Sequence, residues 1–317
     1  MSEEFSNIKK REKIRLEKKL NLGHLAALIT IVIWATTFVS TKILLESFEP
    51  IEILLFRFVL GYIALLLVYP KPLHVKDKRQ ELYFALAGLT GICTYYLLEN
   101  IALTYTQASN VGVVISVAPI FTALLSRFFL KDRTGQGAGF YAGFALAIIG
   151  IMLISFEGCA LQLNPLGDLL ALLAALVWAC YSLLGRKIAS FGYNTIQTTR
   201  RTFAYGIGFM LPTLLFFDFS WDLSGLSSPV NLFNLLYLGL GASALCFVTW
   251  NYAVKTLGAL KTSIYIYLVP VITVLFSVLI LHETITLVSA AGILLTIAGL
   301  AVSQKGEFNN FKTLKSK

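Results

Sequence analysis

The sequence predicts an all-α membrane protein with ten transmembrane helices, arranged as two inverted-topology five-helix repeats. Three observations support this fold class: an apolar composition, a series of long apolar segments and an internal duplication. Of the 317 residues, 57% are hydrophobic and 14% are charged, whereas soluble domains carry nearer a quarter charged residues. A chain with so few charged residues has too little polar surface to face water on all sides. We therefore expect lipid to surround much of it.

The apolar segments are long enough to cross a membrane. A hydrocarbon core of ~30 Å requires roughly 20 apolar residues in a helix. Backbone polar groups in lipid must form hydrogen bonds within their own segment, which favours helices. We therefore expect transmembrane helices at 22–42, 50–69, 82–104, 108–130, 137–156, 166–187, 195–217, 231–255, 260–281 and 284–303.

Charges in the connections predict the orientation. Alternate connections, at 43–49, 105–107, 157–165, 218–230 and 282–283, contain no Lys or Arg. On the other side, the connections or the span ends beside them carry Lys and Arg, and both termini are basic, as is typical of cytoplasmic loops. This pattern predicts a multi-pass protein of the cell membrane with both termini in the cytoplasm. The predicted units are a basic N-terminal segment, two repeats and a tail, at 1–20, 21–160, 161–304 and 305–317.

The second half of the chain repeats the first. Trp34-Ala35 recurs as Trp178-Ala179, and Asn100 and Pro119 recur as Asn251 and Pro270 with equal spacing. Because a repeat of five spans is odd, the second copy must begin on the opposite side of the membrane. Many secondary transporters have such inverted repeats, with the substrate site near the midplane.

Motifs in both copies extend this pattern. They are Trp34-Ala35-Thr36-Thr37-Phe38, Pro50, Arg57-Phe58, Leu130-Lys131-Asp132, Leu268-Val269-Pro270, Leu281-His282-Glu283 and the pair Gly292 and Gly299. Over roughly 20–303, the sequence resembles the drug/metabolite transporter superfamily, of the EamA type; Asp132 stands where that family usually has Glu. The resemblance implies ten helices and alternating access around a central cavity. It also implies that spans one, three, four, six, eight and nine line the cavity.

Two charged residues inside apolar spans are the sharpest functional candidates. Arg57 lies about seven residues into the second span, where a charge costs roughly 2.5–3.5 kcal/mol, and Glu99 lies at a similar depth in the third. They could form a pair that contacts substrate or couples transport to protons, or a static salt bridge. In the second half, Arg200 and Arg201 stand near the Arg57 position and Trp250 replaces the carboxylate. These arginines either extend to lipid headgroups or form an anion-attracting inner mouth.

Aromatic and amide side chains on the expected lining spans are candidates for the cavity wall, since binding cavities combine apolar walls with a few polar groups. Interhelical packing is the alternative for each of them. Pro119 and Pro270 predict paired kinks or hinges, because proline removes a backbone donor from a helix. The substrate-binding candidates are Trp34, Thr37, Tyr95, Tyr96, Glu99, Asn100, Trp178, Tyr181, Trp250, Asn251 and Tyr265.

The expected function is secondary active transport of small metabolites, most favourably export of amino acids or related compounds. The sequence lacks HExxH, GxSxG and Walker motifs, which argues against an enzyme or an ATP-driven pump. No metal, cofactor or nucleic-acid partner is expected; the partners are a small-molecule substrate and the lipid bilayer. Import of a nucleotide-like or vitamin-like solute, a passive channel, and a membrane enzyme or flippase subunit stay open as alternatives, as do monomer and homodimer.

Overall fold

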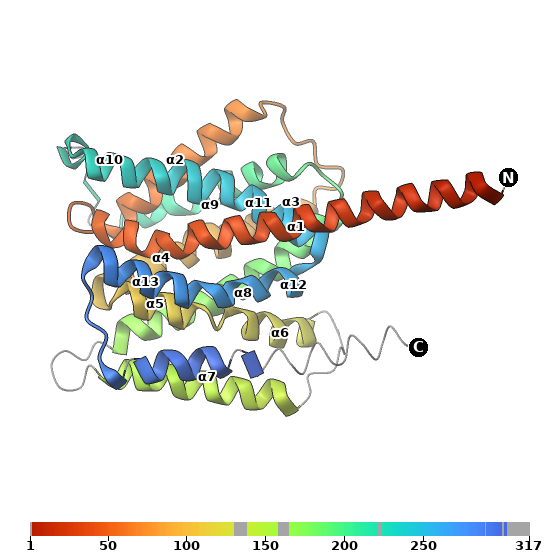
Figure 1. The fold of residues 1–317 in the computed structure, drawn as a ribbon. Helices are drawn as coiled ribbons and strands as arrows, with labels where there is room; N and C mark the ends of the chain where they lie inside the picture. The colour runs from red at the N-terminus through yellow and green to blue at the C-terminus, as the bar shows by residue number, and fades with distance from the viewer. Residues whose placement is uncertain are drawn as a thin grey trace.

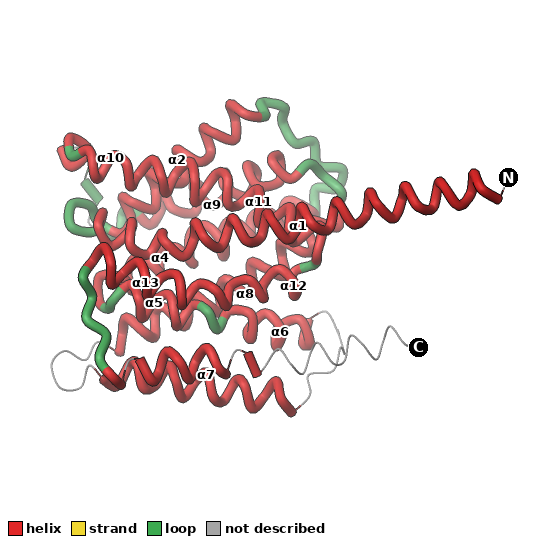
Figure 2. The backbone as a smooth tube through the Cα atoms, viewed as in Figure 1, coloured by secondary structure: helices red, strands yellow, loops and turns green. Residues whose placement is uncertain are grey.

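The computed structural model describes residues 2–129, 138–157, 165–217, 219–220, 224–288, 290–299 and 301–302. Within these residues every regular element is a helix, and the helices lie side by side in one bundle (Figures 1 and 2). The expected all-α fold is therefore confirmed. The predicted tail at 305–317 and the motif Leu130-Lys131-Asp132 lie outside the described residues.

The described residues of the first half form seven helices and one π-helical segment. The third and fourth apolar segments of the sequence are each divided into shorter pieces rather than forming uniform helices. The elements are α1 (Ser2–Leu44), α2 (Pro50–Val68), α3 (Gln80–Gly88), the π-helical η1 (Leu89–Thr94), α4 (Tyr95–Tyr105), α5 (Ala108–Ile115), α6 (Ala118–Phe129) and α7 (Ala138–Glu157).

The second half has the same kinds of element. Its eighth and ninth apolar segments are also divided, one by a π-helical segment and one by a 3₁₀ segment. The elements are α8 (Pro165–Ser190), α9 (Thr195–Thr213), η3 (Ser224–Ser227), α10 (Pro229–Leu236), the π-helical η4 (Tyr237–Leu245), α11 (Cys246–Leu257), α12 (Ala259–Ser263), the 3₁₀-helical η5 (Ile264–Leu268), α13 (Val269–Leu281) and a last helix over Ala290–Gly299.

Several of these helices are long and apolar enough to cross a membrane. In the part of the chain that the structure describes, six segments qualify by length and composition: Glu17–Leu44, Pro50–Val68, Gln80–Tyr105, Ala108–Phe129, Pro165–Ser190 and Pro229–Leu257. Shorter apolar helices occupy Tyr141–Gly150, Tyr265–Leu281 and Ala290–Gly299. The chain is thus a multi-pass helical membrane protein, and the count of ten spans stays a prediction.

The two ends of the bundle differ in charge. Helix α1 continues from the first apolar segment into the basic N-terminal residues and extends beyond the bundle (Figure 1). We call that end the basic end; Lys71, Lys76 and Lys255 lie there, beyond α2 and at the end of α11. The opposite end, where α1 ends and α13 gives way to Glu283, is called the acidic end.

Prolines mark equivalent breaks in the two halves. Helices α6 and α13 begin at Ala118 and Val269, so Pro119 and Pro270 are each the second residue of a new helix. The sequence predicts kinks inside continuous spans; the structure instead starts a separate helix at each position. Proline is tolerated there because the first-turn N–H groups of a helix have no intrahelical acceptor.

Close packing of α3 against α9 leads to a stability prediction. A Cβ added at Gly88 would lie 2.6 Å from the Gly206 nitrogen and 2.8 Å from the Thr202 oxygen. Both neighbours are backbone atoms, so the helices must separate, and such overpacking costs about 1–3 kcal/mol. We expect Gly88→Ala to lower the thermal unfolding temperature in detergent. The matched control is Gly208→Ala, which meets nothing within 4 Å and should leave that temperature unchanged or raise it.

Candidate functional site

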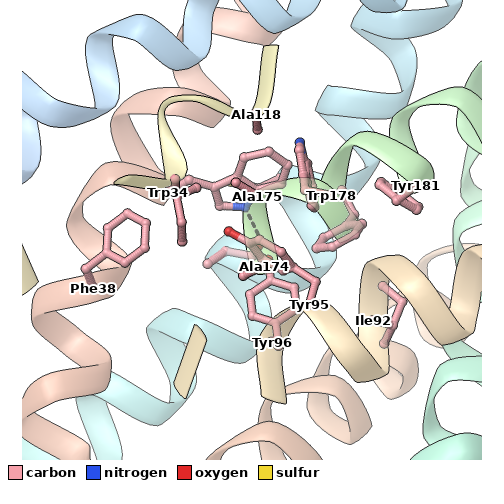
Figure 3. Packing of buried hydrophobic residues seen from close by; sticks show 14 of the residues in the cluster. Trp34, Phe38, Ile92, Tyr95, Tyr96, Ala118, Ala174, Ala175, Trp178 and Tyr181 are labelled. Carbon is pink, nitrogen blue, oxygen red and sulfur yellow. Dashed lines mark hydrogen bonds between the residues drawn. The ribbon is translucent and has the colours of Figure 1, made fainter. Parts of the chain in front are cut away.

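Aromatic rings from both halves meet at the middle of the bundle. The rings of Trp34 and Trp178 have centroids 5.2 Å apart at an interplanar angle of 89°. Trp250 lies 5.1 Å from Trp34 and 6.1 Å from Trp178. The Tyr95 ring lies 4.9 Å from Trp178, and Figure 3 shows Trp34, Trp178 and Tyr95 gathered between the helices. Edge-to-face contacts of this kind add stability beyond the area they bury.

A hydrogen bond from α1 to the π-helical segment of the second half orients this cluster. Trp34 Nε1 donates to the Ala242 carbonyl oxygen at 2.9 Å. Ala242 lies in η4, and π-helical segments occur frequently at functional sites. The indole is therefore held by a backbone oxygen and not by packing alone.

A central pocket opens beside these rings, and its empty space, open solvent included, is about 430 Å³. Its walls come from α1, α4, α5, η5, α8 and α13, so both halves contribute. It includes six of the predicted site residues, and Glu99 is the one charged group among its lining residues. The lining residues are Ile31, Trp34, Thr37, Phe38, Tyr95, Tyr96, Glu99, Ile115, Trp178, Ile266 and Val269.

Glu99 is a buried carboxylate that lacks a partner on one oxygen. The side chain is 1% exposed, and within the described part of the chain Oε1 has no hydrogen-bond donor. Burying a polar atom without a partner costs about 1–3 kcal/mol, and more for a charged group. Glu99 therefore brings an unsatisfied acceptor to the wall of the central pocket.

Arg57 lies next to the pocket without lining it. Its side chain is fully buried, and Nε donates to Ser243 Oγ at 3.1 Å. The guanidinium lies over the Tyr96 ring, 4.3 Å from the centroid, while Nη1 and Nη2 have no acceptor among the described residues. Arg57 and Glu99 are not a contact ion pair, and Tyr96, a wall of the pocket, contacts the cation.

The amides and the remaining aromatic candidates lie outside the central pocket. Asn100 is fully buried, and its Nδ2 donates to the Pro50 carbonyl oxygen at 3.0 Å. This bond ties α4 to the first residue of α2, as an interhelical polar contact does. Trp250 packs behind the cluster at 1% exposure, and Tyr265 forms a hydrogen bond of 2.7 Å with His24 Nδ1.

A second pocket lies toward the basic end, and its empty space, open solvent included, is about 390 Å³. We call it the basic-end pocket. It is formed by the last half of α8, the first half of α9 and the last half of α11. Two predicted site residues, Tyr181 and Asn251, line it. The full lining is Tyr181, Gly185, Ile188, Ala189, Tyr193, Thr195, Thr198, Thr202, Asn251 and Lys255.

Arg200 and Arg201 connect the two halves at the basic end. Arg201 Nη2 lies 2.5 Å from Glu81 Oε1 in a salt bridge. Arg200 donates to the carbonyl oxygens of Tyr69 and Lys71 at 2.5 and 2.6 Å. The structure thus gives both arginines protein partners from distant parts of the sequence, which the sequence alone did not indicate.

Polar contacts close the acidic end. Glu283 accepts hydrogen bonds from the backbone nitrogens of Ala108 and Ser109 at 2.8 and 3.2 Å, at the start of α5. Lys42 Nζ donates to the carbonyl oxygens of Leu103 and Thr106, at the end of α4. A carboxylate at a helix N-terminus satisfies free N–H groups and interacts favourably with the helix dipole.

This contact predicts a measurable loss of stability. We expect Glu283→Ala to destabilise the protein by about 1 kcal/mol, the usual worth of a helix N-terminal cap. Glu283→Gln keeps one acceptor oxygen and should restore about half of that loss. Thermal unfolding in detergent measures both variants, with Glu46→Ala as the control because Glu46 is exposed at the same end. Equal unfolding temperatures for Glu283→Ala and wild type would contradict this role.

The family comparison decides which class of protein carries this arrangement. The EamA-like transporter family matches residues 21–156 and 165–303, which together cover most of the chain. The chain belongs to the EamA-like transporter family. Its members are transporters and not enzymes, so the expected class of function is confirmed.

Related proteins agree with this assignment. This EamA-like chain is 30% identical over 288 residues to an uncharacterized transporter of Archaeoglobus fulgidus, covering 87% of this chain and 95% of that protein. It is 28% identical over 284 residues to a protein of Streptantibioticus cattleyicolor named a probable terminal-alkyne amino-acid exporter, with 89% and 93% coverage. A crystal structure with 19% identity superimposes with a TM-score of 0.62, covering 89% of this chain and 98% of its own, and it shows the same fold.

Some residues around the site of this EamA-like protein carry no sequence signal. Ser243 accepts from Arg57, and Phe247 contacts six rings, among them Trp34 and Trp178. Both are ordinary residues in an apolar segment, and only the packing of η4 and α11 against the first half makes them central. In the sequence, Lys255 is one of several basic residues at span ends. Only the structure shows that it lines the basic-end pocket.

Proposed function

We propose that this protein is a secondary active carrier that exports amino acids or related amines by alternating access around the central pocket. The observation that carries the proposal is Glu99 Oε1, an acceptor without a partner in a pocket walled by Trp34, Trp178, Tyr95 and Tyr96. A carboxylate satisfies an ammonium group, and aromatic faces attract cations. The apolar remainder of the pocket suits the hydrocarbon part of such a solute.

Several features support two inverted repeats of five spans each, at 21–160 and 161–304. The family matches twice, once in each half. Helices begin at Ala118 and at Val269, and π-helical segments occupy Leu89–Thr94 and Tyr237–Leu245, which are equivalent positions of the predicted repeat. Inverted repeats with interrupted helices at the site are typical of secondary transporters. We propose that Pro119 and Pro270 act as the paired hinges.

The proposed orientation places the basic end in the cytoplasm of the cell membrane. Lys and Arg are enriched in cytoplasmic loops, and the helix that leaves the bundle at the basic end is itself basic. The proposed direction is export, in keeping with the name of the relative from Streptantibioticus cattleyicolor. Glu99 is the proposed site of proton coupling, because it is the carboxylate that faces the central pocket.

The function is tested by counterflow in proteoliposomes. Vesicles preloaded with unlabelled L-phenylalanine should accumulate labelled L-phenylalanine transiently, because a carrier exchanges its substrate across the membrane. A passive channel gives simple equilibration without the transient excess. An imposed pH gradient should then drive net flux of L-phenylalanine. A net flux that does not change with the pH gradient would contradict proton coupling but not carrier-mediated transport.

A further inference from the structure

We infer that the basic-end pocket is a second substrate site, which binds the carboxylate of the solute before the solute reaches the central pocket. The inference rests on the proposed function, since it assigns another position on the same path. It starts from the charge of the pocket: Lys255 is its one charged lining residue, and none of its lining residues is Asp or Glu.

The ammonium of Lys255 has free capacity for an anion. Its Nζ donates one hydrogen bond, to the Tyr193 carbonyl oxygen at 3.0 Å. An ammonium carries three donors, and in the described part of the chain no carboxylate forms an ion pair with this one. The side chain is exposed at the mouth of the pocket, where it can meet a solute from the aqueous phase.

Donors from α9 complete the anion site. Thr195, Thr198 and Thr202 line the pocket along the first two turns of this 19-residue helix. The Thr198 hydroxyl already donates to the Thr195 carbonyl oxygen at 2.9 Å, so the donors for a carboxylate are the hydroxyl groups of Thr195 and Thr202. The N-terminal end of a helix also carries partial positive charge. The helix and the lysine therefore favour the same sign of ligand.

Tyr181 stands between the two pockets. Its hydroxyl donates to Asn251 Oδ1 at 3.2 Å in the basic-end pocket, and its ring lies 5.0 Å from Trp178, a wall of the central pocket. In Figure 3, Tyr181 lies on the side of Trp178 away from Trp34. A Cβ at Gly91 would lie 2.2 Å from the Tyr181 ring, so the ring is seated against η1. Tyr181 thus lines the basic-end pocket and also contacts a wall of the central pocket.

The two pockets carry opposite charges along one path. Glu99 is the charged group of the central pocket and Lys255 that of the basic-end pocket. A solute with an ammonium and a carboxylate finds a partner in each. An amine without a carboxylate uses the central pocket alone, and a carboxylate without an amine uses the basic-end pocket alone.

Three ligands test this division: L-phenylalanine, phenethylamine and 3-phenylpropionate, each titrated calorimetrically into the full-length protein in lipid nanodiscs. Lys255→Gln should weaken 3-phenylpropionate binding about fivefold, as expected for a partly exposed ion pair, and leave phenethylamine binding unchanged. Glu99→Gln should have the reverse effect. The control is Lys187→Gln, which removes a charge at the same end; Lys187 contacts the Tyr83 and Phe191 rings outside the pocket.

The outcomes separate this inference from the proposed function. It is overturned if wild type does not bind 3-phenylpropionate, or if Lys255→Gln and Lys187→Gln change its affinity equally. If carboxylate binding depends on Lys255 while L-phenylalanine shows no counterflow, the result supports the basic-end site and contradicts the proposed amino-acid transport. Thr202→Val provides a second variant that keeps the lysine and side-chain shape, and it should also weaken 3-phenylpropionate binding.

Discussion

Glu99→Gln is expected to reduce kcat/KM for L-phenylalanine about 100-fold in proteoliposome counterflow. The amide has the size of the carboxylate, so the pocket keeps its shape and loses only its charge. Hydrogen bonds to charged groups contribute about 1.5–3 kcal/mol, and 1.4 kcal/mol corresponds to tenfold. Glu99 is 1% exposed and has an oxygen without a partner, so solvent does not weaken its interaction with the substrate. The loss of this charged hydrogen bond should therefore lower kcat/KM by its full value.

The control for this variant is Glu46→Gln, which neutralises an exposed carboxylate at the acidic end. It should transport like wild type, which removes a general change of surface charge as the cause. Both variants should reconstitute with normal yield and unfold at wild-type temperatures. Activity of Glu99→Gln within threefold of wild type would contradict the role of the central carboxylate.

Arg57→Met is expected to reduce transport about 30-fold without lowering thermal stability. Arg57 is fully buried with two nitrogens that lack acceptors among the described residues. Replacing a poorly compensated buried charge with an apolar side chain of similar volume is often neutral or stabilising. A loss of transport with an unchanged unfolding temperature would therefore assign Arg57 a functional role. Its positive charge, which lies against Tyr96 in the pocket wall, would then influence the electrostatics of the pocket that contains Glu99.

The double variant Arg57→Met with Glu99→Gln separates coupling from independent effects. If Arg57 acts by balancing the charge of Glu99, the double variant should transport no worse than Glu99→Gln alone. Independent roles would instead multiply the two losses. Arg127→Met serves as the control, since Arg127 is exposed and donates to the Tyr141 hydroxyl.

Much of the fold could be predicted from the sequence because apolar length and backbone satisfaction in lipid leave few alternatives. The starts of α2, α5 and α9, at Pro50, Ala108 and Thr195, agree with the expected boundaries. The π-helical segments and the new helices at Ala118 and Val269 could not be predicted. Hydropathy does not distinguish a continuous apolar helix from an interrupted one.

The candidate site was predicted in outline and not in its contacts. The repeat and the resemblance indicate which spans line a cavity. Trp34, Trp178 and Glu99, all on those spans, lie in one pocket. The partners of charged groups depend on which helices meet. Ser243, the partner of Arg57, and Glu81, the partner of Arg201, come from distant segments. The repeat places Trp250, and no carboxylate, at the position that corresponds to Glu99, so it gives no sign of the Arg201–Glu81 salt bridge.

The central claim is that the Glu99 pocket is reached from both sides of the membrane in turn. Thr37 lines that pocket, so Thr37→Cys, with the four native cysteines replaced by alanine, reports its exposure. A membrane-impermeant thiol reagent should modify this cysteine when it is added from either side, and L-phenylalanine should slow both reactions. Modification from one side only, or rates that L-phenylalanine does not change, would contradict the claim.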